Sequence, residues 1–124
     1  MPTAREALDE LLEMSSSIRH AVIVRGDNEV LASTFASSAA EAAMVRQARA
    51  MIDEARAAVG EMGRSPLTQI FVEAKSGCVF VALGERDTWL AATTGTEPTV
   101  GLVLYDVNTA LRTALEGEAA EGGK

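Results

Sequence analysis

The sequence predicts a mixed α/β domain, in which an antiparallel β-sheet carries helices on both of its faces. Three observations indicate this fold class. Segments with helical and strand-like patterns follow one another in the order helix, strand, strand, long helix, three strands, helix. Short turn sequences separate neighbouring strand segments, which favours antiparallel hairpins over parallel crossovers. Residues 21–24 are apolar at every position, as is typical of a central strand that is covered on both faces.

Length and composition indicate one domain that binds proteins rather than nucleic acid. The 124 residues suit a single hydrophobic core. Hydrophobic residues make up 48% of the chain but aromatic residues only 4%, so we expect an aliphatic core. The formal net charge of −7 argues against nucleic acid or an anionic membrane as a partner. We expect the domain to span residues 1–116 and a disordered polar tail to follow at residues 117–124.

Features that report on the cellular compartment favour the cytoplasm. The single cysteine, Cys78, excludes an internal disulfide bond and is typical of a reducing compartment. The first ten residues are charged and show no apolar signal region. The apolar run at residues 78–83 is far shorter than the about 20 residues that a membrane-spanning helix needs. We therefore expect a cytoplasmic protein that does not insert into membranes.

The first helix is predicted by its capping residues. Residues 3–6 read Thr-Ala-Arg-Glu, the capping-box pattern in which the first and last side chains bond to each other's backbone N–H groups. Leu8 and Leu11 follow at helical spacing. We expect a helix over residues 4–14.

The first hairpin is predicted by two apolar runs around a turn sequence. Residues 20–25 and 30–34 are strand-like, and Gly-Asp-Asn at residues 26–28 tolerates the positive φ of tight turns. Residues 25–27 read Arg-Gly-Asp, which is also the tripeptide of cell-adhesion ligands. Because no signal region precedes it, we interpret this tripeptide as the tip of the hairpin.

The longest regular segment is a predicted helix over residues 39–62, which the capping-box sequence Ser-Ala-Ala-Glu at residues 38–41 opens. Apolar residues, among them Ile52 and Met62, follow one side of this helix. A column of alanines repeats every seven residues. It either allows a second helix to approach closely or consists of good helix formers on a solvated surface. The column comprises Ala43, Ala50 and Ala57, and the polar side of the helix comprises Arg46, Arg49, Asp53 and Arg56.

Three further strands are predicted after the long helix. Glycine and proline residues between positions 60 and 66 end the helical pattern. Strands are expected over residues 67–74, 78–83 and 88–94, joined by short turns that contain glycine. Trp89, the only tryptophan, lies in the last of these strands, where we expect it to pack in the core.

The closing segment has two possible structures. Residues 100–105 have the β-propensity of a sixth strand. Apolar residues nevertheless continue at helical spacing as far as Leu115, and Thr96 and Pro98 suit the start of a helix. We therefore favour a helix over residues 97–115.

The sequence contains no recognisable catalytic site. The one histidine, His20, has no neighbouring Ser, Cys or Asp in the pattern of a triad. Cys78 begins an apolar strand with only Lys75 nearby as an activating group. Metal sites need clustered Cys and His, and phosphate loops need glycine patterns that do not occur here. We therefore expect no cofactor, and a binding or assembly module rather than an enzyme.

A set of segments carries a family resemblance. They are IRHAVIV and VLAST of the first hairpin, the long Met- and Ala-rich helix, QIFVEAKSGCVFVALGERDTWLAATT, and the closing helix that ends in LRTALE. In this pattern the chain resembles the Roadblock/dynein-light-chain family over roughly residues 4–116. The resemblance implies an α/β sandwich with a five-stranded sheet of order 2-1-5-4-3. It places the long helix on one face and the two terminal helices on the other.

The resemblance also implies a homodimer. The third strands of two chains would pair into one continuous sheet, and the long helices would lie side by side. Pairing would remove the aggregation hazard that an exposed apolar strand edge presents in a monomer. The residues that this arrangement places at the dimer interface are Ala43, Ala50, Glu54, Ala57, Gln69, Ile70, Phe71, Val72 and Glu73.

The function that the resemblance implies is binding to a small Ras-like GTPase, which bacterial members of the family regulate or scaffold through their long helices. The implied partner-binding residues are Arg46, Arg49, Asp53 and Arg56. These residues could instead form a solvated helix face with i,i+4 ion pairs, such as Arg49 with Asp53. The rival functions are a dimeric structural adaptor without a GTPase and a profilin-like sensor of small ligands. The low aromatic content argues against a ligand pocket.

Overall fold

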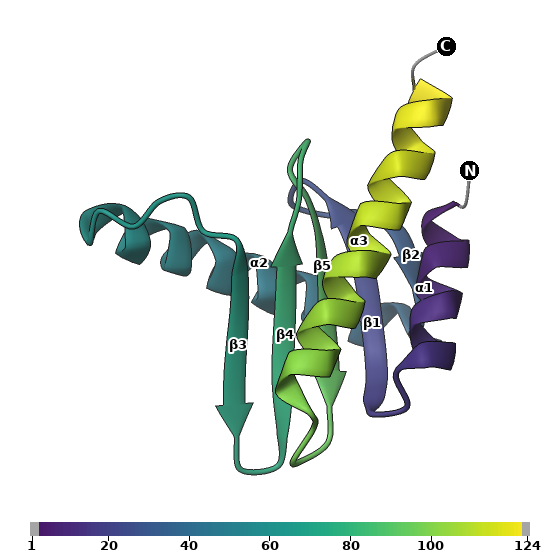
Figure 1. The fold of residues 1–124 in the computed structure, drawn as a ribbon, viewed down its shortest axis with the longest axis horizontal. Helices are drawn as coiled ribbons and strands as arrows, with labels where there is room; N and C mark the ends of the chain where they lie inside the picture. Colours follow the sequence, from purple (N-terminus) through teal and green to yellow (C-terminus); the bar gives the residue numbers. More distant parts are fainter. Residues whose placement is uncertain (1–2, 123–124) are drawn as a thin grey trace.

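The protein folds into one sheet between two helical layers, as the computed structural model of residues 3–122 shows (Figure 1). The eight elements follow in the predicted order. They are α1 (Ala4–Met14), β1 (Ile18–Arg25), β2 (Glu29–Ser33), α2 (Ser38–Glu61), β3 (Gln69–Ala74), β4 (Gly77–Leu83), β5 (Thr88–Thr94) and α3 (Val100–Gly122).

The sheet is antiparallel and has the order β2-β1-β5-β4-β3, which confirms the expected topology. In Figure 1, α1 and α3 lie in front of the sheet and α2 lies behind it. β1 and β5 form its centre and pair from Ile18–Thr94 to Arg25–Thr88. β1 is buried on both faces as expected, because Ala21 and Ile23 contact the layer of α1 and α3, and Val22 contacts the layer of α2.

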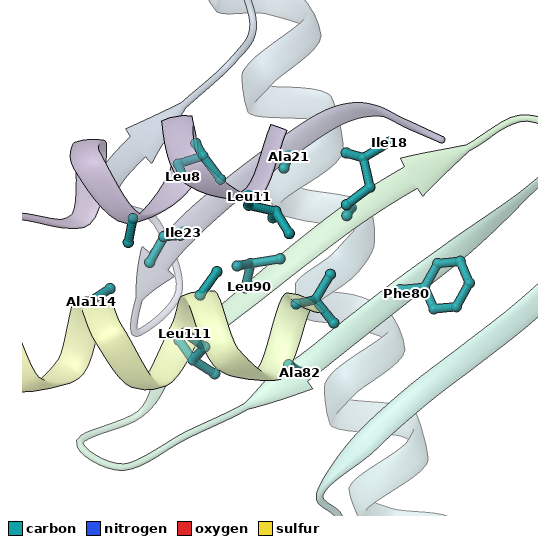
Figure 2. Packing of buried hydrophobic residues seen from close by; sticks show 14 of the residues in the cluster. Leu8, Leu11, Ile18, Ala21, Ile23, Phe80, Ala82, Leu90, Leu111 and Ala114 are labelled. Atoms are coloured by element: carbon teal, nitrogen blue, oxygen red, sulfur yellow. The ribbon is translucent and has the colours of Figure 1, made fainter. Parts of the chain in front are cut away.

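The two layers are packed very differently. Leu8 and Leu11 of α1 and Leu111 of α3 meet Ile23 and Leu90 of the sheet in the larger cluster, which Figure 2 shows. The cluster beneath α2 is smaller, and the buried residues of this 24-residue helix are only Val45, Ala48 and Ile52. Figure 1 also shows that α2 continues past the sheet beyond β3. Much of α2 therefore remains available for contacts outside the chain.

The start of α1 is as predicted. Thr3 Oγ1 accepts from the backbone N–H of Glu6 at 3.1 Å, and the backbone N–H of Thr3 donates to Glu6 Oε1 at 2.9 Å. The hydrogen bond from the backbone N–H of Thr3 to the Glu6 carboxylate, with a smaller contribution from the Thr3 side chain, lowers the pKa of Glu6 below its ordinary value of 4.5. Because the folded pKa is lowered, this contribution to stability is present above the unfolded pKa and is lost as the pH falls through the folded value.

The start of α2 differs from the prediction by one residue. The N-cap is Ser37, whose Oγ accepts from the backbone N–H of Ala40 at 3.2 Å, and Ser38 is already helical. The capping box expected at residues 38–41 is therefore wrong. Two adjacent serines offer the same side chain to the helix start, and the sequence pattern did not distinguish between them. Met62, expected on the buried side, is the exposed C-cap residue because the helix ends at Glu61.

The bounds of α3 also correct the prediction. The helix begins after Thr99, whose carbonyl accepts from Val103 N–H at 3.0 Å. Glu97 has a φ of +57°, which is incompatible with the expected start. The sixth strand does not form. The expected disordered tail is helical through Gly122, and residues 123–124 lie outside the described residues. Glu118, in this last part of the helix, forms an ion pair with Arg25 at the end of β1.

The two serines provide a test of the helix start. We expect Ser37→Ala to lower the free energy of unfolding by about 1 kcal/mol, because an N-terminal N–H of α2 loses its acceptor. We expect the matched control, Ser38→Ala, to change it by less than about 0.5 kcal/mol. Urea denaturation at one fixed protein concentration measures both values. The reverse order of the two effects would contradict this start of α2.

Candidate protein-interaction site

β3 is an open edge of the sheet. Within residues 3–122 it pairs only with β4, so its outer backbone N–H and C=O groups have no strand beside them. Phe71 and Val72 lie on this strand with 39% and 38% of their surface exposed. Gln69 and Glu73 are exposed as well, and Ile70 is half-buried. A six-residue apolar edge of this kind is a template for pairing with another strand.

The opposite edge, β2, is less suited to pairing. This strand has only five residues, and its register with β1 shifts between Ile23 and Val24. The guanidinium of Arg5 donates to the carbonyl oxygen of Ser33 at 2.6 Å, and the Ser33 hydroxyl accepts from Phe35 N–H at 3.0 Å. A short, bulged edge that is covered by a charged side chain resists pairing. β3 is therefore the edge that is suited to an intermolecular sheet.

The alanine column of α2 is largely accessible. Ala50, Glu54 and Ala57 are exposed, and Ala43 is half-buried. The end of α2 that leads to β3 projects beyond the sheet (Figure 1). The structure thus brings together two of the features that the resemblance implied for a dimer, an open β3 and a projecting helix of small side chains. It contains one chain, so the interface itself stays a prediction.

Arg49, one of the four expected partner-binding residues, makes several contacts within the chain. Its side chain is only 17% exposed. Nη1 donates to the carbonyl oxygen of Gly26 at 3.1 Å and to Asp87 Oδ1 at 3.2 Å. Nε lies 3.3 Å from carboxylate oxygens of Asp27 and Asp53, without the alignment of a hydrogen bond. Arg49 therefore joins α2 to the β1–β2 turn and to the β4–β5 turn.

The neighbouring carboxylates favour the protonated, charged form of the Arg49 guanidinium. Burial lowers the pKa of the guanidinium, but the hydrogen bond and the charge of Asp87, together with the charges of Asp53 and Asp27, outweigh it and raise the pKa above its ordinary value. Because the folded pKa is raised, the stabilisation is present throughout the range below the ordinary value and is lost only at higher pH. The ion pair of Arg49 with Asp53, expected as the alternative to partner binding, is present.

The other expected partner-binding residues are accessible. Arg46 is exposed, and no carboxylate within residues 3–118 lies within 4.0 Å of its guanidinium nitrogens. Arg56 is exposed and lies 3.7 Å from Asp87. Asp53 is exposed beside a hollow of about 520 Å³ between α2 and the first hairpin, whose lining also includes Val45 and Arg46. These three side chains can therefore contact a partner without unfolding any part of the chain.

The Arg-Gly-Asp sequence forms the tip of the first hairpin, as predicted. Gly26 has a φ of +68°, and its N–H donates to the carbonyl oxygen of Asp87 at 2.8 Å. Its carbonyl accepts from Trp89 Nε1 at 2.8 Å as well as from Arg49. Arg25 pairs with carboxylates of its own chain, and Asp27 lies beside Arg49. All three residues of the tripeptide therefore contact other residues of the same chain. Trp89 is buried in the core as expected.

The residues considered for catalysis are placed apart from one another. His20 stacks on Phe35 with ring centroids 4.6 Å apart, on the α2 side of the sheet. Cys78 is buried in the cluster beneath α1 and α3. Over the described part of the chain, no group of three or more His, Cys, Asp or Glu side chains is arranged to hold a metal ion. Nor is any helix in that part long and apolar enough to cross a membrane.

Comparison with known proteins agrees with this architecture. Residues 4–94 match the family model of the Roadblock/LC7 domain. The chain belongs to the Roadblock/LC7 family. The resemblance noted in the sequence is thereby confirmed.

Several solved structures share the fold. A Roadblock/LC7 domain from Streptomyces avermitilis has a TM-score of 0.80 at 20% identity, over 87% of this chain and 91% of that one. The gliding protein MglB from Thermus thermophilus has a TM-score of 0.77 at 16% identity, over 90% and 84% of the two chains. MglB from Myxococcus xanthus has a TM-score of 0.78 at 11% identity, over 94% and 88%. No curated protein matches this chain at a significant level.

The internal role of Arg49 can be separated from a partner-binding role. We expect Arg49→Met to lower the free energy of unfolding by about 1.5–3 kcal/mol, because a mostly buried, charge-assisted hydrogen-bond network loses its donor. We expect Arg46→Met, four-fifths of a turn away on the same helix, to change it by less than about 0.5 kcal/mol. Urea denaturation at a fixed protein concentration measures both. If Arg49→Met lowered the free energy of unfolding as little as Arg46→Met, the contacts of Arg49 would contribute nothing to stability.

Proposed function

We propose that this Roadblock domain forms a homodimer through β3 and α2. The observation that carries the proposal is the difference between the two sheet edges. β2 is short, bulged and covered by Arg5, whereas β3 leaves Phe71 and Val72 exposed. Pairing β3 with its copy would satisfy its free backbone groups and cover both side chains. The projecting end of α2 would then lie over the partner's sheet, and its column of alanines would permit close approach of the two helices.

We propose further that the dimer acts in the cytoplasm by binding and regulating a small Ras-like GTPase through α2. Membership of the Roadblock/LC7 family supports this, together with the accessibility of Arg46, Asp53 and Arg56. The helix is anchored by Arg49, so these three side chains are presented from a fixed position. The protein would contribute no catalytic group and no cofactor of its own. Its effect on the GTPase would come from the conformation that it stabilises.

The dimer can be tested by light scattering. We expect the wild type to have the mass of two chains. Val72→Lys should raise the dimer dissociation constant at least about tenfold, because it places two like charges in the paired strands. Asn28→Lys is the matched control, since it adds the same charge at the exposed tip of the first hairpin and should leave the mass unchanged. A wild-type monomer at micromolar concentration would refute the proposed assembly.

The GTPase partner can be tested with purified Ras-like GTPases loaded with GDP or with a non-hydrolysable GTP analogue. Binding should depend on the nucleotide state, and Arg46→Glu with Arg56→Glu should weaken it about tenfold, mainly through a slower association rate. Arg112→Glu reverses an exposed charge on α3 and serves as the control. Failure of every candidate in both nucleotide states, with an intact dimer, would leave a structural adaptor as the function.

A further inference from the structure

Exposed large apolar side chains form two groups on this molecule. Met62, Phe71 and Val72 belong to the end of α2 and to β3, the region of the proposed dimer. The second group lies on α1 and α3, across the sheet from α2 (Figure 1). It consists of Met14, Leu102 and Tyr105, with exposed fractions of 59%, 62% and 67%. The proposed dimer leaves this second group uncovered, although apolar patches of this kind mark interaction surfaces.

The second group borders a shallow groove between the two helices. Leu11 and Met14 of α1 and Ala110 of α3 line it, and so do the carboxyl-bearing residues Glu10 and Asp106. Leu102 lies one helical turn before Asp106, and Tyr105 lies one turn before Thr109, which also lines the groove, so these two apolar side chains extend the same face of α3 beyond the lining. We refer to these residues together as the α1–α3 groove.

The charge of the groove is negative throughout. Its lining contains Glu10 and Asp106 but no Lys, Arg or His. Within residues 3–122, neither carboxylate has a basic nitrogen within 4.0 Å. Glu13 follows Glu10 on α1 and is exposed as well. A second copy of this chain, which carries a net charge of −7, would bring carboxylates against carboxylates here. A basic partner would pair with them instead.

The shape of the groove restricts the kind of partner. The hollow between the helices measures only about 20 Å³, whereas small-molecule sites usually measure about 300–1,000 Å³. Both walls are helices whose backbone groups are already hydrogen-bonded, so an added strand would find no backbone partners. A helix that lays an apolar stripe along a shallow groove fits these limits.

We propose that the α1–α3 groove binds a basic amphipathic helix of another protein. The apolar stripe of that helix would contact Met14, Leu102 and Tyr105, and its Lys or Arg residues would pair with Glu10 and Asp106. This surface is separate from α2 and β3, so each chain would offer it as a monomer or in a dimer.

The test uses a fluorescein-labelled helical peptide of about 18 residues, or roughly five turns, with Leu at i, i+3, i+4 and i+7 and Lys elsewhere. A second peptide carries Glu in place of every Lys. Fluorescence anisotropy should show binding of the Leu/Lys peptide and at least about tenfold weaker binding of the Leu/Glu peptide. Leu102→Ser with Tyr105→Ser should weaken binding of the Leu/Lys peptide about tenfold or more. Circular dichroism confirms that each variant is folded.

Charge-matched variants decide whether the groove is the binding site. Glu10→Lys with Asp106→Lys should weaken binding about tenfold or more and flatten its salt dependence. Glu85→Lys with Glu97→Lys makes the same change in net charge at exposed positions outside the groove, and should alter affinity less than about twofold. Equal losses in the two double variants would mean general attraction to an acidic chain, and would overturn the proposal. Equal binding of both peptides would also overturn it.

Two further measurements test whether a second copy of the chain occupies the groove and whether peptide binding requires the proposed dimer. A lower light-scattering mass for Leu102→Ser with Tyr105→Ser would show that a second copy covers the groove, and would overturn the proposal. An unchanged mass supports it. Peptide binding should be the same per chain in Val72→Lys as in the wild type. Failure of the dimer and failure of the groove are thereby distinguishable.

Discussion

The guanidinium of Arg49 bonds α2 to two turns of the sheet. The apolar contacts of this helix are few, with three buried side chains, so they fix its orientation on the sheet less firmly than the contacts of α1 and α3 fix theirs. Arg49 adds directional contacts to two separate turns, through the carbonyl of Gly26 and the carboxylate of Asp87. These bonds hold the helix at one end of the sheet. The opposite end of the helix can then project beyond β3 while the orientation of α2 on the sheet is kept.

The β4–β5 turn connects the two helical layers. Arg86 and Asp87 have φ values of +58° and +50°, a conformation that costs free energy for residues other than glycine. The backbone bond from Thr88 N–H to the carbonyl of Glu85 closes the turn at 3.1 Å. Asp87 accepts from Arg49 on the side of α2, and Arg86 donates to the carbonyl of Leu115 in α3 at 2.8 Å. These two side-chain bonds offset the cost of the turn and fix both layers to it.

Local sequence patterns predicted the elements and the family, but not the contacts that hold the layers together. Capping and periodicity depend on residues within a few positions of one another, so α1 and the central strands were predicted well. Arg49 and Asp87 are 38 residues apart, and Arg25 and Glu118 are 93 apart. Only the folded topology brings such pairs together. Arg49 was therefore placed with the accessible arginines of α2, and the helical residues after Glu116 were taken for a tail. Asp87 and Glu118 were missed because nothing in their own neighbourhoods distinguishes them from solvated carboxylates.

The sheet separates two surfaces of different chemistry. β1 and β5 are buried from both sides, with Val22 and Trp89 beneath α2 and Ile23 and Leu90 beneath α1 and α3. These two apolar clusters lie between the surface of α2 and β3 and the α1–α3 groove. The former presents small and mixed-charge side chains beside an open strand, which suits a matching copy and an interface of moderate polarity. The latter presents apolar side chains beside two carboxylates that have no ion-pair partner among the described residues, which would oppose a matching copy. If both proposals hold, each face of this small domain would recognise a different kind of partner.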